Sequence, residues 1–278
     1  MSIRRRYEGR SVETVCVFSR NGSGNANMEG RAVNIVNIGD VRQLMLNRPA
    51  RRNALDGGSI SALEQALQQA DRDPQVRAIV LSGASPAFCS GSDLKELATM
   101  SIQEMCDSES DTARVARSIA AMSKPVIAAV EGFALGGGFV LAISCDIVVS
   151  ATDVRWHLPE VPNGWLPPWG LQALLARVGP VRARLLTWAA DAMNGVEAHR
   201  IGVADYLSEP GAADQTALAL ANRLAALPAA AVASTKRFFE PFVSLDGERL
   251  DNLASRHFAR NCEGGAAQTI FSKFKVKS

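Results

Sequence analysis

The sequence predicts an α/β fold in which a largely buried sheet is followed by a helical C-terminal region. Three observations support this prediction. Apolar strands alternate with helical patterns between residues 33 and 149, which is typical of right-handed β-α-β units. The run at 126–130 is apolar at every position, as expected of a strand covered on both faces. Beyond about residue 208 the pattern is almost entirely helical and rich in alanine and leucine.

Residues 1–32 differ from the rest of the chain. They contain six arginines and three glutamates, and the stretch 21–25 reads Asn-Gly-Ser-Gly-Asn. Small polar residues of this kind are typical of a flexible extension. We therefore divide the chain into an N-terminal extension (1–32), an α/β core (33–210) and a helical C-terminal region (211–278).

Hydrophobic periodicity predicts the elements of the core in chain order. Apolar segments at 32–38 and 41–46 flank a Gly-Asp pair, which predicts a β-hairpin. Ile60, Leu63 and Leu67 recur at the spacing of one helix face. The other expected elements are a helix at 59–70, a strand at 76–81, a helix at 111–122, the strand at 126–130, a helix at 136–144, a strand at 147–149 and a helix beginning at Pro228.

The composition limits the classes of function. Lysine and arginine total 30 and aspartate and glutamate total 28, a near balance that argues against a nucleic-acid binder. Hydrophobic residues make up 47% of the chain, which is enough for a sizeable core and argues against disorder. No run of eighteen apolar residues occurs, so we expect no membrane-spanning helix.

The cysteines and histidines indicate neither disulfides nor a metal site. The five cysteines are scattered, and no Cys-x-x-Cys pair occurs. The three histidines are too far apart in sequence to form a local metal motif. The N-terminal arginines are not followed by the apolar segment of a secretory signal. We therefore expect a cytoplasmic protein without a bound metal.

Two segments of small residues follow predicted strands. Residues 88–96 (Phe-Cys-Ser-Gly-Ser-Asp-Leu-Lys-Glu) and 131–139 (Glu-Gly-Phe-Ala-Leu-Gly-Gly-Gly-Phe) each lead into an expected helix. The first N–H groups of a helix have no intrahelical partner, so they suit an oxygen that bears negative charge. A local cap, or tight packing of helix on strand, explains the same residues. The second segment is neither a dinucleotide fingerprint nor a Walker loop.

The segment 156–170 combines three tryptophans with four prolines, which predicts a rigid, apolar loop. Glu160 lies within it. An apolar environment disfavours the ionised form of a carboxyl group and raises its pKa toward neutrality. Glu160 is therefore a candidate proton-transfer group, and an exposed loop acid is the alternative. His157 is a candidate to orient Glu160, or else a partly buried structural histidine.

Taken together and in this order, these segments resemble the crotonase superfamily, also called the enoyl-CoA hydratase/isomerase family. The resemblance runs from about residue 33 to the C-terminus. The matching segments are Asn-Arg-Pro-x-x-x-Asn-Ala-Leu at 47–55, Phe-x-x-Gly-x-Asp-Leu at 88–94, the run 124–138, Cys-Asp-Ile-Val at 145–148 and Pro-Glu at 159–160. The resemblance implies a crotonase-type core of ββα spiral units with a helical C-terminal region, assembled as a homotrimer or a dimer of trimers.

The resemblance also implies roles for individual residues. The backbone N–H groups of Ser92 and Gly137 would form an oxyanion hole for a thioester enolate, with Glu160 as the acid/base. The substrate would be an acyl-CoA, or an acyl carrier protein thioester, and no cofactor would be needed beyond the coenzyme A of the substrate.

Four further residues are candidates for contact with the substrate. Arg52 and Lys95 would meet the charged groups of coenzyme A. Gly136 would let the thioester approach the backbone closely. Trp165 would contact a bulky or aromatic acyl group by stacking.

One feature of the family's hydratases is missing. They carry two glutamates, one of them at the position that is Val140 here. Each positioned proton-transfer group contributes about 10²–10⁴-fold, so hydration should suffer, whereas a double-bond shift needs only one base. The chain also resembles hydroxycinnamoyl-CoA hydratase-lyases and polyketide-type decarboxylases. A catalytically silent acyl-CoA binder is the alternative outside the enzymes.

Overall fold

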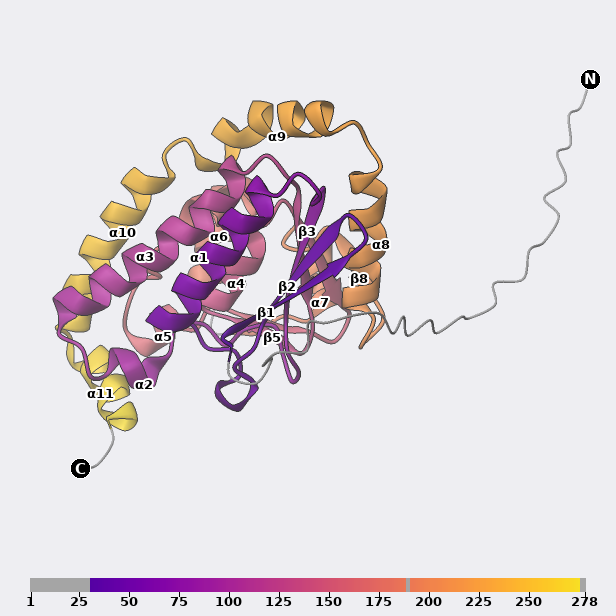
Figure 1. Ribbon diagram of the computed structural model, residues 1–278. Coiled ribbons are helices and arrows are strands. Elements are labelled where there is room, and N and C mark those ends of the chain that lie inside the picture. Colours follow the sequence, from indigo (N-terminus) through magenta and orange to yellow (C-terminus); the bar gives the residue numbers. More distant parts are fainter. Residues whose placement is uncertain (1–30, 189–190, 276–278) are drawn as a thin grey trace, which may run out of the picture. The chain divides into compact units, whose positions relative to one another are not determined.

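The computed structural model describes residues 31–188 and 191–275, and its central element is a six-stranded sheet (Figure 1). The strands lie in the order β1-β2-β3-β4-β6-β8. β1 and β2 form the predicted antiparallel hairpin, and the later neighbours are parallel. The strand bounds are Val33–Ile38 (β1), Val41–Leu46 (β2), Ala78–Gly83 (β3), Val126–Val130 (β4), Ile147–Ala151 (β6) and Tyr206–Ser208 (β8).

Helices cover both faces of this sheet. Alternate residues of a strand point to opposite faces, so each strand packs one set of side chains on each layer of helices. β4 shows the consequence. Ile127 and Ala129 lie in an apolar cluster with α8, whereas Val126, Ala128 and Val130 lie in a second cluster with α1, α3 and α4. The strand is therefore apolar at all its positions, as predicted. The bounds of these helices are Gly57–Arg72 (α1), Ile102–Ala121 (α3), Gly137–Ile143 (α4) and Ala213–Ala225 (α8).

Three more helices follow α8, which confirms the predicted helical C-terminal region. α10 packs along α3 and α6, and α11 contacts α2 and α5 (Figure 1). Phe258 of α10 and Phe271 of α11 thereby join Trp165 in a third apolar cluster. The bounds are Leu94–Leu97 (α2), Glu160–Asn163 (α5), Leu171–Trp188 (α6), Ala229–Ser244 (α9), Gly247–Cys262 (α10) and Gly265–Phe274 (α11).

Two predicted elements have different bounds in the structure. The helix expected at 111–122 begins at Ile102, because Ser101 and Glu104 form a capping box in which each side chain accepts a hydrogen bond from the other residue's backbone N–H. The first turns of this helix are mostly polar, which hides their periodicity. The strand expected at 76–81 is β3, and it begins and ends two residues later.

The segment 156–170 is not one continuous loop, so that prediction was wrong. β7 (Arg155–His157) pairs in parallel with β5 (Phe133–Leu135), and α5 begins at Glu160. Three-residue strands and one-turn helices are too short to show a hydrophobic period. α6 and α7 (Gly195–Arg200) also went unpredicted, and α6 is interrupted at Gly179, whose φ of 73° lies outside the helical region.

The first turn of α4 requires glycine because it packs on backbone. A Cβ atom on Gly138 would lie 2.5 Å from the carbonyl oxygen of Cys89. That oxygen also accepts a hydrogen bond from the N–H of Leu135, so it is held in place. Tight packing of helix on strand therefore accounts for one of the three consecutive glycines.

Gly138→Ala should lower the free energy of unfolding by about 1–3 kcal/mol, because the new methyl group forces a rigid backbone apart. The matched control is Gly265→Ala in the first turn of α11, where a Cβ would meet nothing within 4 Å. That change should be neutral or should stabilise the protein by about 0.4–1 kcal/mol. Urea unfolding of both variants tests the difference, and equal stabilities would contradict it.

Candidate active site

Glu160 is buried at the start of α5, with 7% of its surface exposed. Its Oε2 atom is buried and has no hydrogen-bond partner among the residues that the structure describes. The pKa of Glu160 is raised to about 8, chiefly by burial and to a smaller extent by the nearby charge of Glu109, while the backbone N–H of Glu160 itself acts in the opposite direction. A carboxyl group in this state can hold or release a proton near neutral pH.

Gly136 makes room for this carboxyl group. Its φ is +52°, a conformation that L side chains rarely adopt, and a Cβ atom there would lie 2.8 Å from Oε1 of Glu160. The N–H of Gly136 donates to the carbonyl oxygen of His157 at a distance of 2.9 Å, and this hydrogen bond fixes the turn beside α5. Glycine at this position therefore places an ionisable oxygen directly against the backbone that begins α4.

Ser92 and Gly137, the residues of the predicted oxyanion hole, line the same cavity as Glu160. Gly137 is the first residue of α4, so its N–H has no intrahelical partner. Ser92 lies opposite Leu55 in a parallel bridge. The N–H of Leu55 donates to the carbonyl oxygen of Gly91, and the N–H of Asp93 donates to the carbonyl oxygen of Leu55, so the N–H of Ser92 itself points away from Leu55. A Cβ atom on the adjoining Gly91 would lie 3.1 Å from the nitrogen of Gly137, so the two segments are in contact.

These groups open into one cavity of about 60 Å³. Five of the predicted site residues line it: Ser92, Gly136, Gly137, Glu160 and Trp165. Its remaining wall is largely apolar and includes Leu94, Leu97, Pro167, Pro168, Phe258 and Phe271. The ring of Trp165 stacks on that of Phe271 with centroids 5.0 Å apart and an interplanar angle of 8°, so the C-terminal helices help to exclude water from the carboxyl group.

Arg52 and Lys95 lie elsewhere. Both side chains are exposed, and neither belongs to the described residues that line the cavity. Arg52 ends a short 3-10 helix (Pro49–Arg51) with a φ of 55°, and its carbonyl oxygen accepts a hydrogen bond from the N–H of Ser90. Its backbone thus supports the loop that contains Ser92. Contact of either side chain with coenzyme A stays a prediction.

Val140 fills the position of the missing glutamate. It is buried, and its Cγ1 atom would lie 1.9 Å from a Cβ placed on Gly170. The φ of Gly170 is +74°, so glycine is required there by conformation and by space together. His157 is not among the described residues that line the cavity, and its buried Nε2 atom has no hydrogen-bond partner within the described segments. Burial raises the pKa of the Cys89 thiol to about 12, which excludes a reactive thiolate.

Glu109 is a residue of this cavity that sequence reasoning missed. It lies on α3 and is 5% exposed, and its Oε2 atom accepts a hydrogen bond from Nε1 of Trp169 at 2.7 Å. Burial raises its pKa, against hydrogen bonds from the Ser92 hydroxyl and Trp169 that lower it. One signal was present, because Met105, Glu109 and Ala116 share a face of α3, and an acid on an apolar helix face is rarely left buried without a reason.

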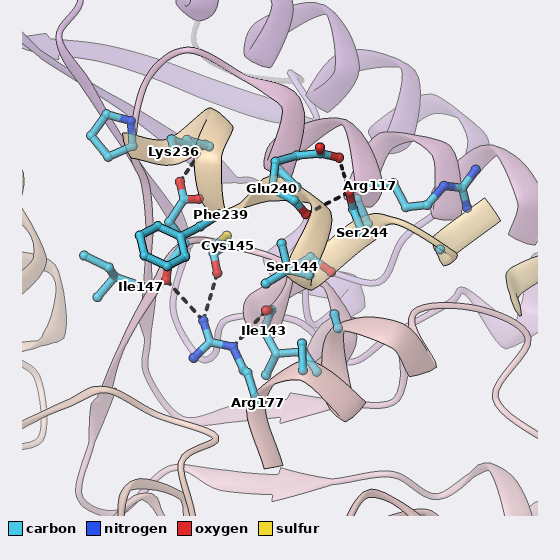
Figure 2. Close-up of a pocket in the computed structure, with 18 of the residues that line it drawn as sticks. Arg117, Ile143, Ser144, Cys145, Ile147, Arg177, Lys236, Phe239, Glu240 and Ser244 are labelled. Atoms are coloured by element: carbon cyan, nitrogen blue, oxygen red, sulfur yellow. Dashed lines mark hydrogen bonds and ion pairs between the residues drawn. The ribbon is translucent and has the colours of Figure 1, made fainter. Parts of the chain in front are cut away.

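A larger cavity of about 640 Å³ lies between α9 and the helices α3, α4 and α6 (Figure 2). Two of its basic groups are already paired: Arg177 donates to the carbonyl oxygens of Ile143 and Cys145, and Lys236 pairs with Asp146. The smaller cavity, which contains Glu160 and the N–H groups at the start of α4, is therefore the candidate active site.

Among residues 31–188 and 191–275, no group of three or more His, Cys, Asp or Glu side chains is arranged to hold a metal ion. In those same ranges no single helix combines the length and hydropathy needed to cross a membrane, whereas the bent pair Ala213–Ala225 and Ala229–Cys262 meets the criterion by length and composition.

Comparison with known proteins shows the family to which the chain belongs. The enoyl-CoA hydratase/isomerase family model matches residues 38–262. The short-chain-enoyl-CoA hydratase of Clostridium acetobutylicum is 34% identical over 212 residues, which cover 76% of this chain and 81% of that protein. The crotonyl-CoA hydratase of Syntrophomonas wolfei is 37% identical over 169 residues, 60% of this chain and 65% of that protein. The match therefore spans slightly less than two thirds of the latter protein's length.

Solved structures agree. An enoyl-CoA hydratase/isomerase from Mycobacterium paratuberculosis superposes with a TM-score of 0.78 at 25% identity, covering 89% of this chain and all of that one (100%). One from Xanthobacter autotrophicus gives a TM-score of 0.79 at 25% identity, over 87% of this chain and 91% of that one. The chain belongs to the enoyl-CoA hydratase/isomerase family, and it is an enzyme of that family with the predicted crotonase-type α/β fold.

Glu160→Gln should change how stability depends on pH. Because burial raises the pKa of Glu160 from 4.5 to about 8, its protonated form contributes stability that is fully present below about pH 4.5 and is lost as the pH rises through about 8. The variant lacks this loss. Relative to the wild type it should gain on the order of a few kcal/mol between pH 5 and pH 9.

Urea unfolding at several pH values measures this difference. Glu209→Gln, at an exposed loop position, is the matched control and should follow the wild type at every pH. A constant difference between Glu160→Gln and the wild type would mean that Glu160 titrates like a solvated acid.

Proposed function

We propose that this enzyme transfers protons on an acyl-CoA thioester, with Glu160 as the acid/base and the N–H groups of Ser92 and Gly137 as the oxyanion hole. One observation supports this above all others. The carboxyl group of Glu160, whose buried Oε2 atom has no hydrogen-bond partner among the described residues, shares a small cavity with Ser92 and with Gly137, the first residue of α4. Such a group is costly to the fold, and a substrate that exchanges protons with it gives it a use.

The oxyanion hole acts on the thioester oxygen. When a proton leaves the α-carbon, its electron pair moves onto this oxygen and forms an enolate. Two fixed N–H donors at the start of α4 and in the loop before α2 stabilise that charge without reorganisation, and the apolar walls strengthen the interaction.

Glu160 moves the proton. As a carboxylate it takes a proton from the α-carbon of a β,γ-enoyl thioester, and as a carboxylic acid it returns that proton to the γ-carbon, which shifts the double bond. A pKa of about 8 keeps both forms accessible near neutral pH. The reaction moves protons and no other group, so the proposal includes no cofactor beyond the coenzyme A of the substrate.

The size of the cavity favours a short acyl group. The cavity measures about 60 Å³, and the stacked rings of Trp165 and Phe271 form part of its apolar wall. Two relatives are named as a crotonyl-CoA hydratase and a short-chain-enoyl-CoA hydratase. These names agree with a short acyl group and with coenzyme A as its carrier. We therefore propose a short-chain acyl-CoA in preference to a hydroxycinnamoyl-CoA or a carrier-protein thioester.

Assembly as a homotrimer or a dimer of trimers is part of the same proposal. Phe238, Phe239 and Phe242 cluster on α9 with ring centroids 5.1–6.2 Å apart, and all three are more than half exposed. A contiguous aromatic patch of this kind is typical of a protein–protein contact. The oligomerisation role of residues 211–278 and the cytoplasmic location are likewise proposals, whereas the flexible extension predicted at 1–32 falls almost entirely outside the described residues.

Glu160→Gln should slow deuterium incorporation at the α-carbon of butyryl-CoA in D₂O by about 10²–10⁴-fold, because the amide cannot carry the proton. Mass spectrometry measures the exchange, and isothermal titration should show that butyryl-CoA still binds. Glu209→Gln, remote from the cavity lining, should exchange at the wild-type rate. Exchange that persists in Glu160→Gln would overturn the proposed mechanism, and binding without exchange in the wild type would favour a silent binder.

A further inference from the structure

The candidate active site contains two buried carboxyl groups, of which the proposed function uses one. Glu109 reaches the cavity from α3 and Glu160 from α5. They are near enough for the charge of Glu109 to act on Glu160. Val140 makes its side of the cavity, next to Gly170, apolar. The second carboxyl group of the cavity comes instead from a different helix.

The surroundings of the two carboxyl groups are unequal. Glu109 accepts a hydrogen bond from Nε1 of Trp169 at 2.7 Å, and this donor favours its ionised form. Oε2 of Glu160 lacks a donor among the described residues, which favours its protonated form. Two carboxylates in one apolar cavity cannot both ionise at low cost. The difference in donors therefore favours a resting pair that holds one proton, with that proton on Glu160.

Ser92 connects Glu109 to the place where the thioester would bind. In the proposed function its N–H holds the thioester oxygen, and its side chain lines the same small cavity as Glu109 and lowers the pKa of that carboxyl group. The carboxylate of Glu109 is thus one side chain away from the oxyanion hole. The β-carbon of an enoyl thioester lies two bonds beyond the carbonyl carbon, so a water molecule between Glu109 and the β-carbon would be within reach of both.

We propose that Glu109 is the second proton-transfer carboxylate of this site, and that it activates the water which adds to an α,β-enoyl thioester. The proposal rests on the proposed function of Glu160 and the oxyanion hole. It means that this chain hydrates double bonds although the glutamate that follows the triple glycine in family hydratases is valine here.

Glu109 takes one proton from water, and the water oxygen forms a bond to the β-carbon. The π-electron pair of the α,β double bond moves through the α-carbon to the thioester oxygen, which the N–H groups of Ser92 and Gly137 hold. The enolate then returns its electron pair to the α-carbon, which takes the proton of Glu160. The product is a β-hydroxyacyl thioester, and the proton now on Glu109 passes through solvent to Glu160, which restores the resting pair.

The experiment compares two reactions in the same protein. Hydration of crotonyl-CoA needs both carboxyl groups, whereas α-proton exchange of butyryl-CoA in D₂O needs Glu160 alone. Glu109→Gln should lower kcat/KM for hydration by about 10²–10⁴-fold and should lower exchange by no more than about tenfold, because the amide oxygen still accepts the hydrogen bond of Trp169. Asp107→Asn, an exposed acid-to-amide change on the same helix, should leave both rates unchanged.

Glu109→Asp keeps the carboxylate and should retain more hydration activity than Glu109→Gln. This variant keeps the test valid if the glutamine variant does not fold. The proposal would be overturned if Glu109→Gln left hydration unaffected. It would also be overturned if hydration and exchange were lost in parallel, because that result would show a purely structural role for Glu109. A wild type that exchanges but does not hydrate would overturn it as well. Exchange that survives Glu160→Gln would instead refute the proposed function itself.

Discussion

The desolvated carboxyl group of Glu160 is the constraint on which the rest of the site depends. A buried acid is tolerated where it is neutral or where it exchanges its proton with a partner, and here burial raises its pKa to about 8. Every neighbouring feature preserves that state. Gly136 leaves space against the backbone, α5 presents the side chain from its first residue, and the stacked rings of Trp165 and Phe271 close the apolar wall.

The buried polar groups around Glu160 are connected across distant parts of the chain. Trp169, from the turn before α6, donates to Glu109 on α3, and the next residue along, Gly170, donates through its backbone N–H to Asp251 on α10. Asp251 is in turn paired with Arg117 of α3. Helix α10 is therefore held to α3 and to the turn before α6 by charge-assisted hydrogen bonds as well as by apolar contact. Removing one partner would leave a buried charge or N–H unsatisfied.

The sequence predicted those parts of the fold whose physical cause is local. The hairpin at 32–46, the wholly apolar strand β4 and the helical C-terminal region follow from periodicity and turn chemistry. The location of Glu160 in an apolar segment was also readable from the tryptophans and prolines around it. For Glu109 the sequence shows only an acid on an apolar face of α3, because the cavity that it lines and its partner Trp169 are assembled from segments that are distant in sequence. The short strands β5 and β7 were missed because their pairing is tertiary.

A crystal structure with a bound, unreactive acyl-CoA analogue tests the central claim most directly. The account predicts the thioester oxygen about 2.7–3.1 Å from the nitrogens of both Ser92 and Gly137. It also predicts the α-carbon against the carboxyl group of Glu160, and the acyl group against Trp165. An acyl group lodged in the larger cavity beside α9, or a thioester oxygen held by groups other than these two N–H donors, would contradict it.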